Sequence, residues 1–549
     1  MLPQLWQATE KQRIRISMIR DFHAAGRGPV YAANAMAATS MPEATLTAIE
    51  VLKAGGNAMD AAIAAAAVLA VVEPQSTGVG GDLFCLYAPA QGGKVVALNG
   101  SGRTPAGLSL EALAARGLSS YDAGSAHSVT VPAGVGAWEK LLKSYGRKGL
   151  DELLQPAIRF AEEGYIVTPR VAADWAEPET EAKLRKNNAH LFLPGGAAPK
   201  AGTKMRNPAL AATLRAIAKD GAKAFYTGPI AQAIVADLQA RGGFHTEEDF
   251  AAGLDAAEFV TPIRHKFAGH EVWECPPNGS GLIALMLMGL MDGFTPEPGA
   301  DPLDPLRLHR HIEAARLVYR DRDAFLGDPA FSDVPVAHLL SCAYLDGLRK
   351  MIVDDHAQTI LPAAGHLHKD TVYLCVVDAQ GNCCSLINSI FQSFGSGIVP
   401  ADTGVVLHNR GFGFSLKPGH PNQVAPNKRP MHTIIPALVF KNSRPEIVFG
   451  VMGGQYQPMG QSWVLANMLH YGMDPQAALD LPRLFPYQGK VEVERLIPAA
   501  ARAALLAKGH QLQEIALPHG GGQVIRLDYE RGILIGGSDP RKDGCALGY

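Results

Sequence analysis

Residues 371–378 (TVYLCVVD) form an almost uninterrupted apolar run, and a second run, CCSLINS at 383–389, follows after the short polar segment AQGN. Two such runs joined by a tight polar segment predict a β-hairpin. Side chains alternate between the two faces of a strand, so a strand that is apolar at consecutive positions must be covered on both sides. The hairpin is therefore expected inside a sandwich of other layers.

The chain before residue 360 predicts mainly helices. A helix from Pro42 to Ala54 is followed by one that begins with Asn57 as its cap and stops before Pro74. The second is apolar on every side, which is typical of a buried helix. Further helices are expected at 108–115, 135–145, 150–164, 207–220, 229–241, 283–291, 306–323 and from just after 454 to about 470; strands are expected at 83–87, 403–408, 436–440, 445–450, 523–528 and 532–536. This order predicts a layered α+β fold.

Charge and composition exclude several classes of protein. The 50 Lys and Arg residues balance 52 Asp and Glu, so the basic excess of a nucleic-acid-binding protein is missing. The most apolar run, 61–72, is too short to span a membrane, and residues 1–28 lack the apolar segment of a secretory signal. Seven scattered cysteines without a C-x-x-C pair predict reduced thiols. We expect a cytoplasmic protein without nucleic-acid or membrane partners.

Most short catalytic motifs are absent, including G-x-S-x-G, H-E-x-x-H and the Walker A loop. The glycine-rich loop 75–82 lacks G-x-G-x-x-G spacing and precedes a strand, so nucleotide binding is disfavoured. His309 and His311 are two residues apart and do not share a helix face, so we interpret them as structural. Thr371, directly after Asp370, remains the main candidate, although a Thr that opens a strand also fits ordinary β-propensity.

A series of blocks in the chain resembles the γ-glutamyltransferase family of N-terminal-nucleophile hydrolases. The blocks are AGGNAMDAAIAAAAVLAVVEPQSTGVGGD (54–82), VTVPAGVGAW (129–138), residues 150–164, IEAARLVYRDRDAFLGDP (312–329), HKDTVYLCVVDAQGN (368–382), FGSGIVPADTGVVLHN (394–409), PNKRP (426–430), GVMGG (450–454) and SDPRKDGCALGY (538–549). Their number and common order make the resemblance specific from about Ala32 to the C-terminus.

The resemblance implies a proenzyme that cuts itself between Asp370 and Thr371. An N-terminal extension (1–30) would precede a large subunit (31–370), and the small subunit would comprise 371–549. The two fragments are expected to form a heterodimer with a four-layer αββα sandwich and to need no cofactor or metal. Thr371 would be the nucleophile, and the α-amine that cleavage exposes, with a pKa of about 7.7–8.0, would be the base that a weak hydroxyl requires.

Three further catalytic positions follow by alignment to Thr371. Ser389 falls where the family places a second hydroxyl beside the nucleophile, with a simple strand-end turn as the alternative. Gly453 and Gly454 match the pair whose backbone N–H groups form the oxyanion hole, with an ordinary turn as the alternative.

The expected substrate-binding positions depart from the γ-glutamyl pattern. Arg410 and Gly413 replace the polar and acidic groups that hold the glutamyl ammonium, and Phe391 replaces an Asn. The family's carboxylate-binding Arg aligns with Ser101, two residues before Arg103, and only three residues remain of the lid loop between 422 and 426. The substrate-binding residues expected in this chain are Arg103, Phe391, Asn409, Arg410, His432 and Thr433, the last two at the family's Ser-Ser pair.

These departures favour a self-processing amide hydrolase or acyltransferase whose substrate carries a carboxylate on its acyl part, such as a glutaryl- or oxamate-type amide. A buried ammonium without a partner costs several kcal/mol, so γ-glutamyl specificity is in doubt. An authentic γ-glutamyltransferase or glutathione hydrolase is the close alternative. A third possibility is that the protein is not an enzyme: an uncut, catalytically silent homologue that serves as a binding protein. The partner expected in the first two cases is a small-molecule amide or γ-glutamyl compound.

Overall fold

Two seven-stranded antiparallel sheets form the centre of the computed structural model, which describes residues 26–90, 92–358, 371–400 and 402–549. In spatial order, the β10 sheet contains β19 (Cys545–Gly548), β2 (Met36–Thr39), β10 (Val372–Val377), β11 (Cys383–Ser389), β3 (Asp82–Ala88), β4 (Val96–Gly100) and β7 (Glu258–Val260). The β13 sheet contains β1 (Val30–Ala32), β18 (Ile533–Ser538), β17 (Gly521–Asp528), β13 (Arg444–Met452), β12 (Ala437–Lys441), β9 (His270–Glu274) and β8 (Ile263–Phe267). Smaller sheets join β14 (Leu484–Tyr487), β15 (Lys490–Val493) and β16 (Leu512–Glu514), and β5 (Tyr165–Ile166) and β6 (Lys204–Met205).

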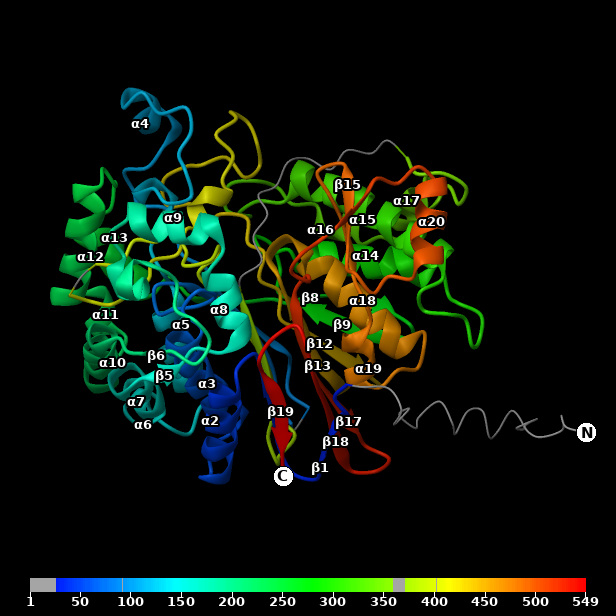
Figure 1. The fold of residues 1–549 in the computed structure, drawn as a ribbon, viewed down its shortest axis with the longest axis horizontal. Helices are drawn as coiled ribbons and strands as arrows, with labels where there is room; N and C mark the ends of the chain where they lie inside the picture. Colours follow the sequence, from blue (N-terminus) through cyan, green and yellow to red (C-terminus); the bar gives the residue numbers. More distant parts are fainter. Residues whose placement is uncertain (1–25, 91, 359–370, 401) are drawn as a thin grey trace, which may run out of the picture.

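Helices cover the outer face of each sheet, as Figure 1 shows. The β10 sheet has α2 (Pro42–Lys53), α3 (Ala58–Val72) and α5 (Gly134–Tyr145) packed on its strands. On the same side, at the left and top of Figure 1, lie α4 (Leu110–Ala115), α6 (Leu150–Leu153), α7 (Gln155–Glu163), α8 (Pro169–Trp175), α9 (Pro178–Lys186), α10 (Pro208–Asp220), α11 (Lys223–Tyr226), α12 (Pro229–Ala240) and α13 (Glu247–Gly253). The β13 sheet is covered by α14 (Gly281–Asp292), α15 (Pro305–Phe325), α16 (Val336–Leu339), α17 (Cys342–Arg349), α18 (Gln457–Leu469), α19 (Pro475–Asp480) and α20 (Ala499–Ala507).

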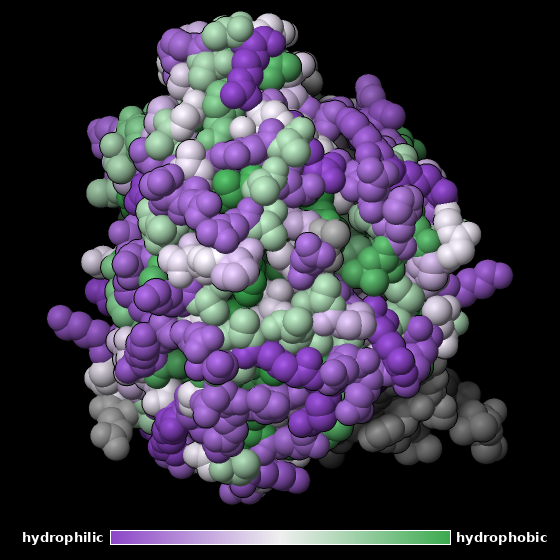
Figure 2. Space-filling view, turned by 90° about the vertical axis from the view of Figure 1, so that its left-hand side faces the viewer, coloured by the Kyte–Doolittle hydropathy of each residue, from purple (hydrophilic) through white to green (hydrophobic). Residues whose placement is uncertain are grey.

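Three apolar cores separate these four layers. One fills the space between the β10 sheet and its helices, another lies between the β13 sheet and α14, α15 and α18, and a third lies between the two sheets. The expected αββα sandwich is therefore confirmed. The face seen in Figure 2, the outside of the first helical layer, carries mainly hydrophilic side chains with apolar ones scattered among them.

Helix α3 illustrates how the sequence determines its local structure. Asn57 caps it by accepting bonds from the N–H groups of Met59 and Asp60, and the Asp60 carboxylate accepts the N–H of Asn57, which completes a capping box. Every residue of α3 is buried, and its small alanines allow close packing on β10. Its first N–H, of Ala58, donates to the Asp378 carboxylate in the turn of the β10–β11 hairpin.

Both sheets combine strands from before and after residue 370. In the β10 sheet, β10, β11 and β19 lie among earlier strands; in the β13 sheet, β12, β13, β17 and β18 lie among earlier strands. In the two seven-stranded sheets, the sequence patterns missed the short strands β1, β2, β4, β7, β8, β9 and β19, whose apolar runs are brief. The strand expected at 403–408 was wrong, because only an isolated bridge joins Leu407 to Gly80 there.

Among the described residues, no helix is both long and apolar enough to cross a membrane.

A buried ion cluster attaches the C-terminal segment to the first helical layer. The Lys542 ammonium lies 3.4 Å from the Asp174 carboxylate in α8 and 3.8 Å from that of Glu73, which follows α3. All three side chains are almost fully buried. Burial raises the pKa of Glu73, and the charge of Lys542 counteracts that rise. Lys542 is thus the cation beside the buried Glu73 carboxylate, whereas Asp174 also pairs with Arg170 at 2.7 Å.

Replacing Lys542 with Met should destabilise the protein by about 3–5 kcal/mol, because it leaves the buried Glu73 carboxylate without its cation. Urea unfolding followed by tryptophan fluorescence measures the loss. The matched control is Lys143→Met, whose side chain is 71% exposed and pairs only with Glu139 one turn away; it should change stability by less than about 0.5 kcal/mol. Equal effects of the two variants would contradict a structural role for the cluster.

Candidate active site

Thr371 and Ser389 face each other at one end of the β10–β11 hairpin. The antiparallel register pairs Val372 with Asn388, so the next residues outward, Thr371 and Ser389, lie side by side. Their hydroxyl oxygens are 3.1 Å apart, and both side chains are buried. The hairpin thus brings together the two hydroxyl residues that the sequence selected separately. The other residue of the expected cleavage site, Asp370, lies outside the described residues.

Ser389 Oγ is the centre of a small hydrogen-bond network. It accepts the backbone N–H of Phe391 at 3.0 Å and a guanidinium N–H of Arg410 at 3.1 Å. The carbonyl oxygen of Ser389 lies only 2.5 Å from the place that a Cβ on Gly81 would occupy. Gly81 and its neighbours in the 75–82 loop therefore serve close backbone packing beside the site.

Arg410 is a fully buried cation in the 3₁₀ turn η4 (Arg410–Gly413). Its guanidinium donates to Ser389 and to Thr433 Oγ1, the latter at 2.9 Å, while its Nε has no hydrogen-bond partner among the described residues. Burial lowers the pKa of Arg410 to about 9, although nearby Asp82 opposes the shift. The side chain is therefore charged at neutral pH and has spare donor capacity.

Phe391 supports the guanidinium from one side. The ring centroid lies 4.2 Å from Arg410 Cζ, a cation–π contact. Phe391 holds this position with a φ of 81°, which is strained for a bulky residue. A Cβ on Gly413 would lie 3.9 Å from the tip of the Phe391 ring. The three departures that the sequence showed, Phe391, Arg410 and Gly413, thus lie together.

Asp82, at the start of β3, is the negative charge of this region. It accepts bonds from His432 Nε2 at 3.0 Å and from the Gly102 N–H at 3.0 Å. Burial alone raises the pKa of Asp82, but His408, His432 and Arg410 outweigh it and lower the pKa to about 2. His432 is neutral, since burial and Arg410 lower its pKa to about 3. Its Nε2–H points at Asp82, and its Nδ1 accepts the Ile434 N–H at 3.4 Å.

Gly453 and Gly454 lie between β13 and α18 with positive φ values of 117° and 55°. A Cβ on Gly453 would meet the backbone of Gly520 at 2.7 Å, so glycine is required there for space as well as conformation. Gln457, in the first turn of α18, accepts the N–H of Ile435 at 3.2 Å. This bond connects the glycine turn to the segment that carries His432 and Thr433.

Two expected substrate-binding residues make other contacts. Arg103 is 35% exposed and pairs with Asp328 at 3.7 Å and Glu258 at 4.0 Å, so its charge is already compensated. Asn409 bonds to Gln392 and to the carbonyl of Ala123, which fixes the loop after Ser389.

Sequence reasoning missed Asp82 and the buried Arg429, whose guanidinium bonds to Ser101 and Glu258. Asp82 directly follows the glycine-rich loop, and Arg429 lies in the PNKRP block, so position in a block was the only signal.

One His/Glu cluster in the described residues has donor atoms close enough to hold a metal ion. It consists of His309, Glu313 and His510, whose nearest donor atoms lie within 4.8 Å of one another. His309 and Glu313 are one turn apart on α15, and His510 reaches them from the loop after α20. The two imidazoles bond to each other at 2.7 Å, and Glu313 pairs with Arg316 at 2.7 Å. His510 Nδ1 has no hydrogen-bond partner among the described residues.

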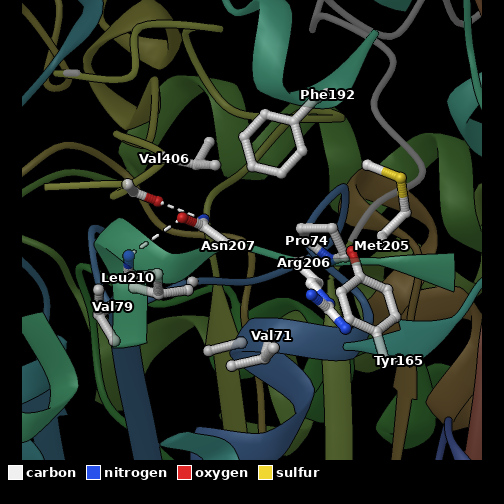
Figure 3. Close-up of a pocket in the computed structure, with 13 residues that line it drawn as sticks. Val71, Pro74, Val79, Tyr165, Phe192, Met205, Arg206, Asn207, Leu210 and Val406 are labelled. Atoms are coloured by element: carbon white, nitrogen blue, oxygen red, sulfur yellow. Dashed lines mark hydrogen bonds between the residues drawn. The ribbon is translucent and has the colours of Figure 1, made fainter. Parts of the chain in front are cut away.

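The closed pocket in Figure 3 lies on the other side of the 75–82 loop. Apolar side chains line it, among them Val71, Val79 and Phe192, and Asn207 bonds across its edge. Its volume of about 10 Å³ is that of a single water molecule. It cannot hold a substrate. An open depression of about 640 Å³ lies beside β8, α14 and α17, and its lining includes none of the residues around Thr371.

The comparisons with known proteins agree with this geometry. The sequence model of the gamma-glutamyltranspeptidase family matches residues 44–549. The YwrD glutathione hydrolase-like proenzyme of Bacillus subtilis is 36% identical, with 91% of this chain and 95% of the relative covered. The oxamate amidohydrolase proenzyme of Klebsiella pneumoniae is 34% identical, with 92% and 97% covered. The crystal structure of cephalosporin acylase from Bacillus halodurans is 40% identical, with a TM-score of 0.89 over 96% of this chain and 98% of that one.

The αββα sandwich is the fold of an N-terminal-nucleophile hydrolase. The chain belongs to the gamma-glutamyltranspeptidase family, and it is an amidohydrolase or acyltransferase of that family.

Replacing Asp82 with Asn should destabilise the protein at pH 7 by about 2–3 kcal/mol, since the folded carboxylate has a pKa of about 2 against an ordinary value of about 3.9. A carboxylate whose pKa is lowered by folding stabilises the folded state fully when the pH is above its ordinary pKa. This contribution is lost as the pH falls towards 2. The difference between wild type and variant in the free energy of unfolding, measured with urea, should therefore become smaller from pH 7 to pH 3. The control is Asp122→Asn, whose side chain is 59% exposed; an equal loss there would contradict the role of burial.

Proposed function

We propose that the chain is a proenzyme that cuts itself between Asp370 and Thr371, and that mature Thr371 hydrolyses amides whose acyl part carries a carboxylate. The buried Arg410 guanidinium is the observation that supports this substrate class. It bonds to Ser389, which also contacts the Thr371 hydroxyl, and its Nε has no hydrogen-bond partner among the described residues. The interleaved strands of the two seven-stranded sheets support a heterodimer of the fragments 31–370 and 371–549, because neither fragment contains all the strands of either seven-stranded sheet.

In the proposed reaction, the α-amine of Thr371 takes the proton of its own hydroxyl as Oγ1 attacks the amide carbonyl carbon. The carbonyl electrons move to the oxygen, which the N–H groups of Gly453 and Gly454 stabilise. Collapse of this intermediate breaks the C–N bond, and the amine leaves with the proton from the α-amine. Water then hydrolyses the ester on Thr371 by the same steps, and a second amine in place of water would give acyl transfer.

Charge decides which acyl group fits beside Arg410. A carboxylate can form two charge-assisted hydrogen bonds with the guanidinium, which restores the pairing that a buried cation needs. The ammonium of a γ-glutamyl group would meet a like charge, and Gly413 supplies no acid to offset it. The relative that hydrolyses oxamate acts on an amide that itself carries a carboxylate, which is consistent with this preference.

The cytoplasmic location that the sequence suggested stays a prediction. The seven cysteines, all free in the structure, are compatible with a reducing compartment.

Purified wild-type protein should separate on a denaturing gel into two fragments, the smaller beginning Thr-Val-Tyr-Leu. Thr371→Ala should remain one 58.2 kDa band, because the hydroxyl that attacks the preceding bond is gone. The control is Ser385→Ala in the same hairpin, whose hydroxyl bonds only to Tyr373 at 2.9 Å; it should still be cut. Cleavage of Thr371→Ala at the same bond without added protease would remove Thr371 from the mechanism.

Wild-type enzyme should hydrolyse glutaryl-p-nitroanilide with a kcat/KM at least about tenfold above that for γ-glutamyl-p-nitroanilide, since one unfavourable buried charge contact exceeds about 1.4 kcal/mol. Arg410→Gln should bring the two values close together, mainly by raising KM for the glutaryl compound. A wild-type preference for the γ-glutamyl compound that Arg410→Gln leaves unaltered would instead mean ordinary γ-glutamyl specificity.

A further inference from the structure

We propose that Arg410 has a second role, which rests on the function proposed above: it acts through Ser389 on Thr371, and so promotes both self-cleavage and catalysis whatever the substrate. Arg410 is thus a positioning residue for the nucleophile as well as the residue that selects the acyl group.

The number of hydrogen bonds that the Ser389 hydroxyl accepts and donates supports this inference. A hydroxyl can accept two hydrogen bonds and donate one. The Phe391 N–H and the Arg410 guanidinium both donate to Ser389 Oγ, so both of its acceptor sites are occupied. Thr371 therefore cannot donate to Ser389, and the 3.1 Å contact between the two hydroxyls must run from Ser389 to Thr371 Oγ1. The proton of the Thr371 hydroxyl therefore does not lie in the contact with Ser389.

The charge of Arg410 strengthens the bond from Ser389 to Thr371. A hydrogen bond from a cation withdraws electron density from the accepting oxygen and makes that hydroxyl a better donor to the next group, as in cooperative chains. The Ser389 hydroxyl donates to the oxygen on which negative charge develops when Thr371 loses its proton. Burial of all three side chains removes the screening by water that would weaken this effect.

The two roles of Arg410 use different parts of one side chain. The guanidinium has five N–H donors, and among the described residues it donates one hydrogen bond to Ser389 and one to Thr433. The Phe391 ring at 4.2 Å and the Thr433 hydroxyl fix its plane. An acyl carboxylate can therefore pair at the edge that includes Nε while the bond to Ser389 persists.

The test uses a substrate that has no carboxylate to bind. Pentanoyl-p-nitroanilide matches the glutaryl compound in chain length but ends in a methyl group. If Arg410 acts through Ser389, Arg410→Gln should lower kcat for the pentanoyl compound about tenfold with little change in KM, the size expected for replacing a charge-assisted bond by a neutral one. Self-cleavage of newly translated Arg410→Gln precursor should slow by a similar factor.

Arg410→Lys, which keeps the charge, should recover part of both rates. The surface control is Arg185→Gln, whose side chain is 52% exposed and pairs with Glu181; it should behave as wild type in both assays.

A double-mutant cycle separates this role from a general loss of structure. Ser389→Ala removes the intermediary, so adding Arg410→Gln to it should cause no further fall in kcat for the pentanoyl compound. On the glutaryl compound, the same addition should still raise KM, because the carboxylate contact does not pass through Ser389. Independent, multiplying effects on the pentanoyl compound would overturn the inference.

Failure of the inference differs from failure of the proposed function. If Arg410→Gln cleaves itself and turns over the pentanoyl compound at wild-type rates, Arg410 has no role through Ser389, whatever its effect on glutaryl specificity. If wild-type protein is never cut, or prefers γ-glutamyl amides, the function proposed above is wrong. Kinetic constants are expressed per cleaved molecule, quantified on gels, so that slow processing does not pass for slow catalysis.

Discussion

The register of the β10–β11 hairpin is the constraint on which the rest of the site depends. Pairing of Val372 with Asn388 places the Thr371 and Ser389 hydroxyls 3.1 Å apart at the end of a sheet that is buried on both faces. The turn that fixes this register is itself held, because the Asp378 carboxylate accepts N–H groups from Gln380, Asn382 and the first residue of α3. A one-residue slip would turn every hairpin side chain to the opposite face.

Around this pair, the protein keeps a cation and an anion buried a short distance apart. Arg410 bonds to Ser389 and Thr433, while Asp82 bonds to His432 and to backbone N–H groups. Each charge shifts the pKa of the other towards its ionised form, so the region stays ionic without a direct salt bridge between them. The Phe391 ring lies against the guanidinium although the Phe391 backbone has a strained φ of 81°.

The interleaving of strands gives chain cleavage a simple structural meaning. Because segments from both sides of residue 370 alternate within each sheet, a cut there changes chain connectivity without removing any strand from its neighbours. The Lys542 cluster adds a buried electrostatic link between the two segments. The sandwich would therefore stay assembled after the cut proposed above.

The sequence by itself determined the buried hairpin, helix α2, helix α3 with its Asn57 cap, the family, and the candidates Thr371, Ser389 and Arg410. Local periodicity and the order of the motifs carry that information. It could not show which charges compensate one another. The tertiary structure alone decided three contacts. Arg103 pairs with Asp328, Asp82 supplies the negative charge near Arg410, and Ser389 Oγ accepts hydrogen bonds from two donors. The physical reason is that these contacts, apart from the local Phe391–Ser389 bond, join residues tens to hundreds of positions apart. Burial gives each of them an energy that no local pattern records.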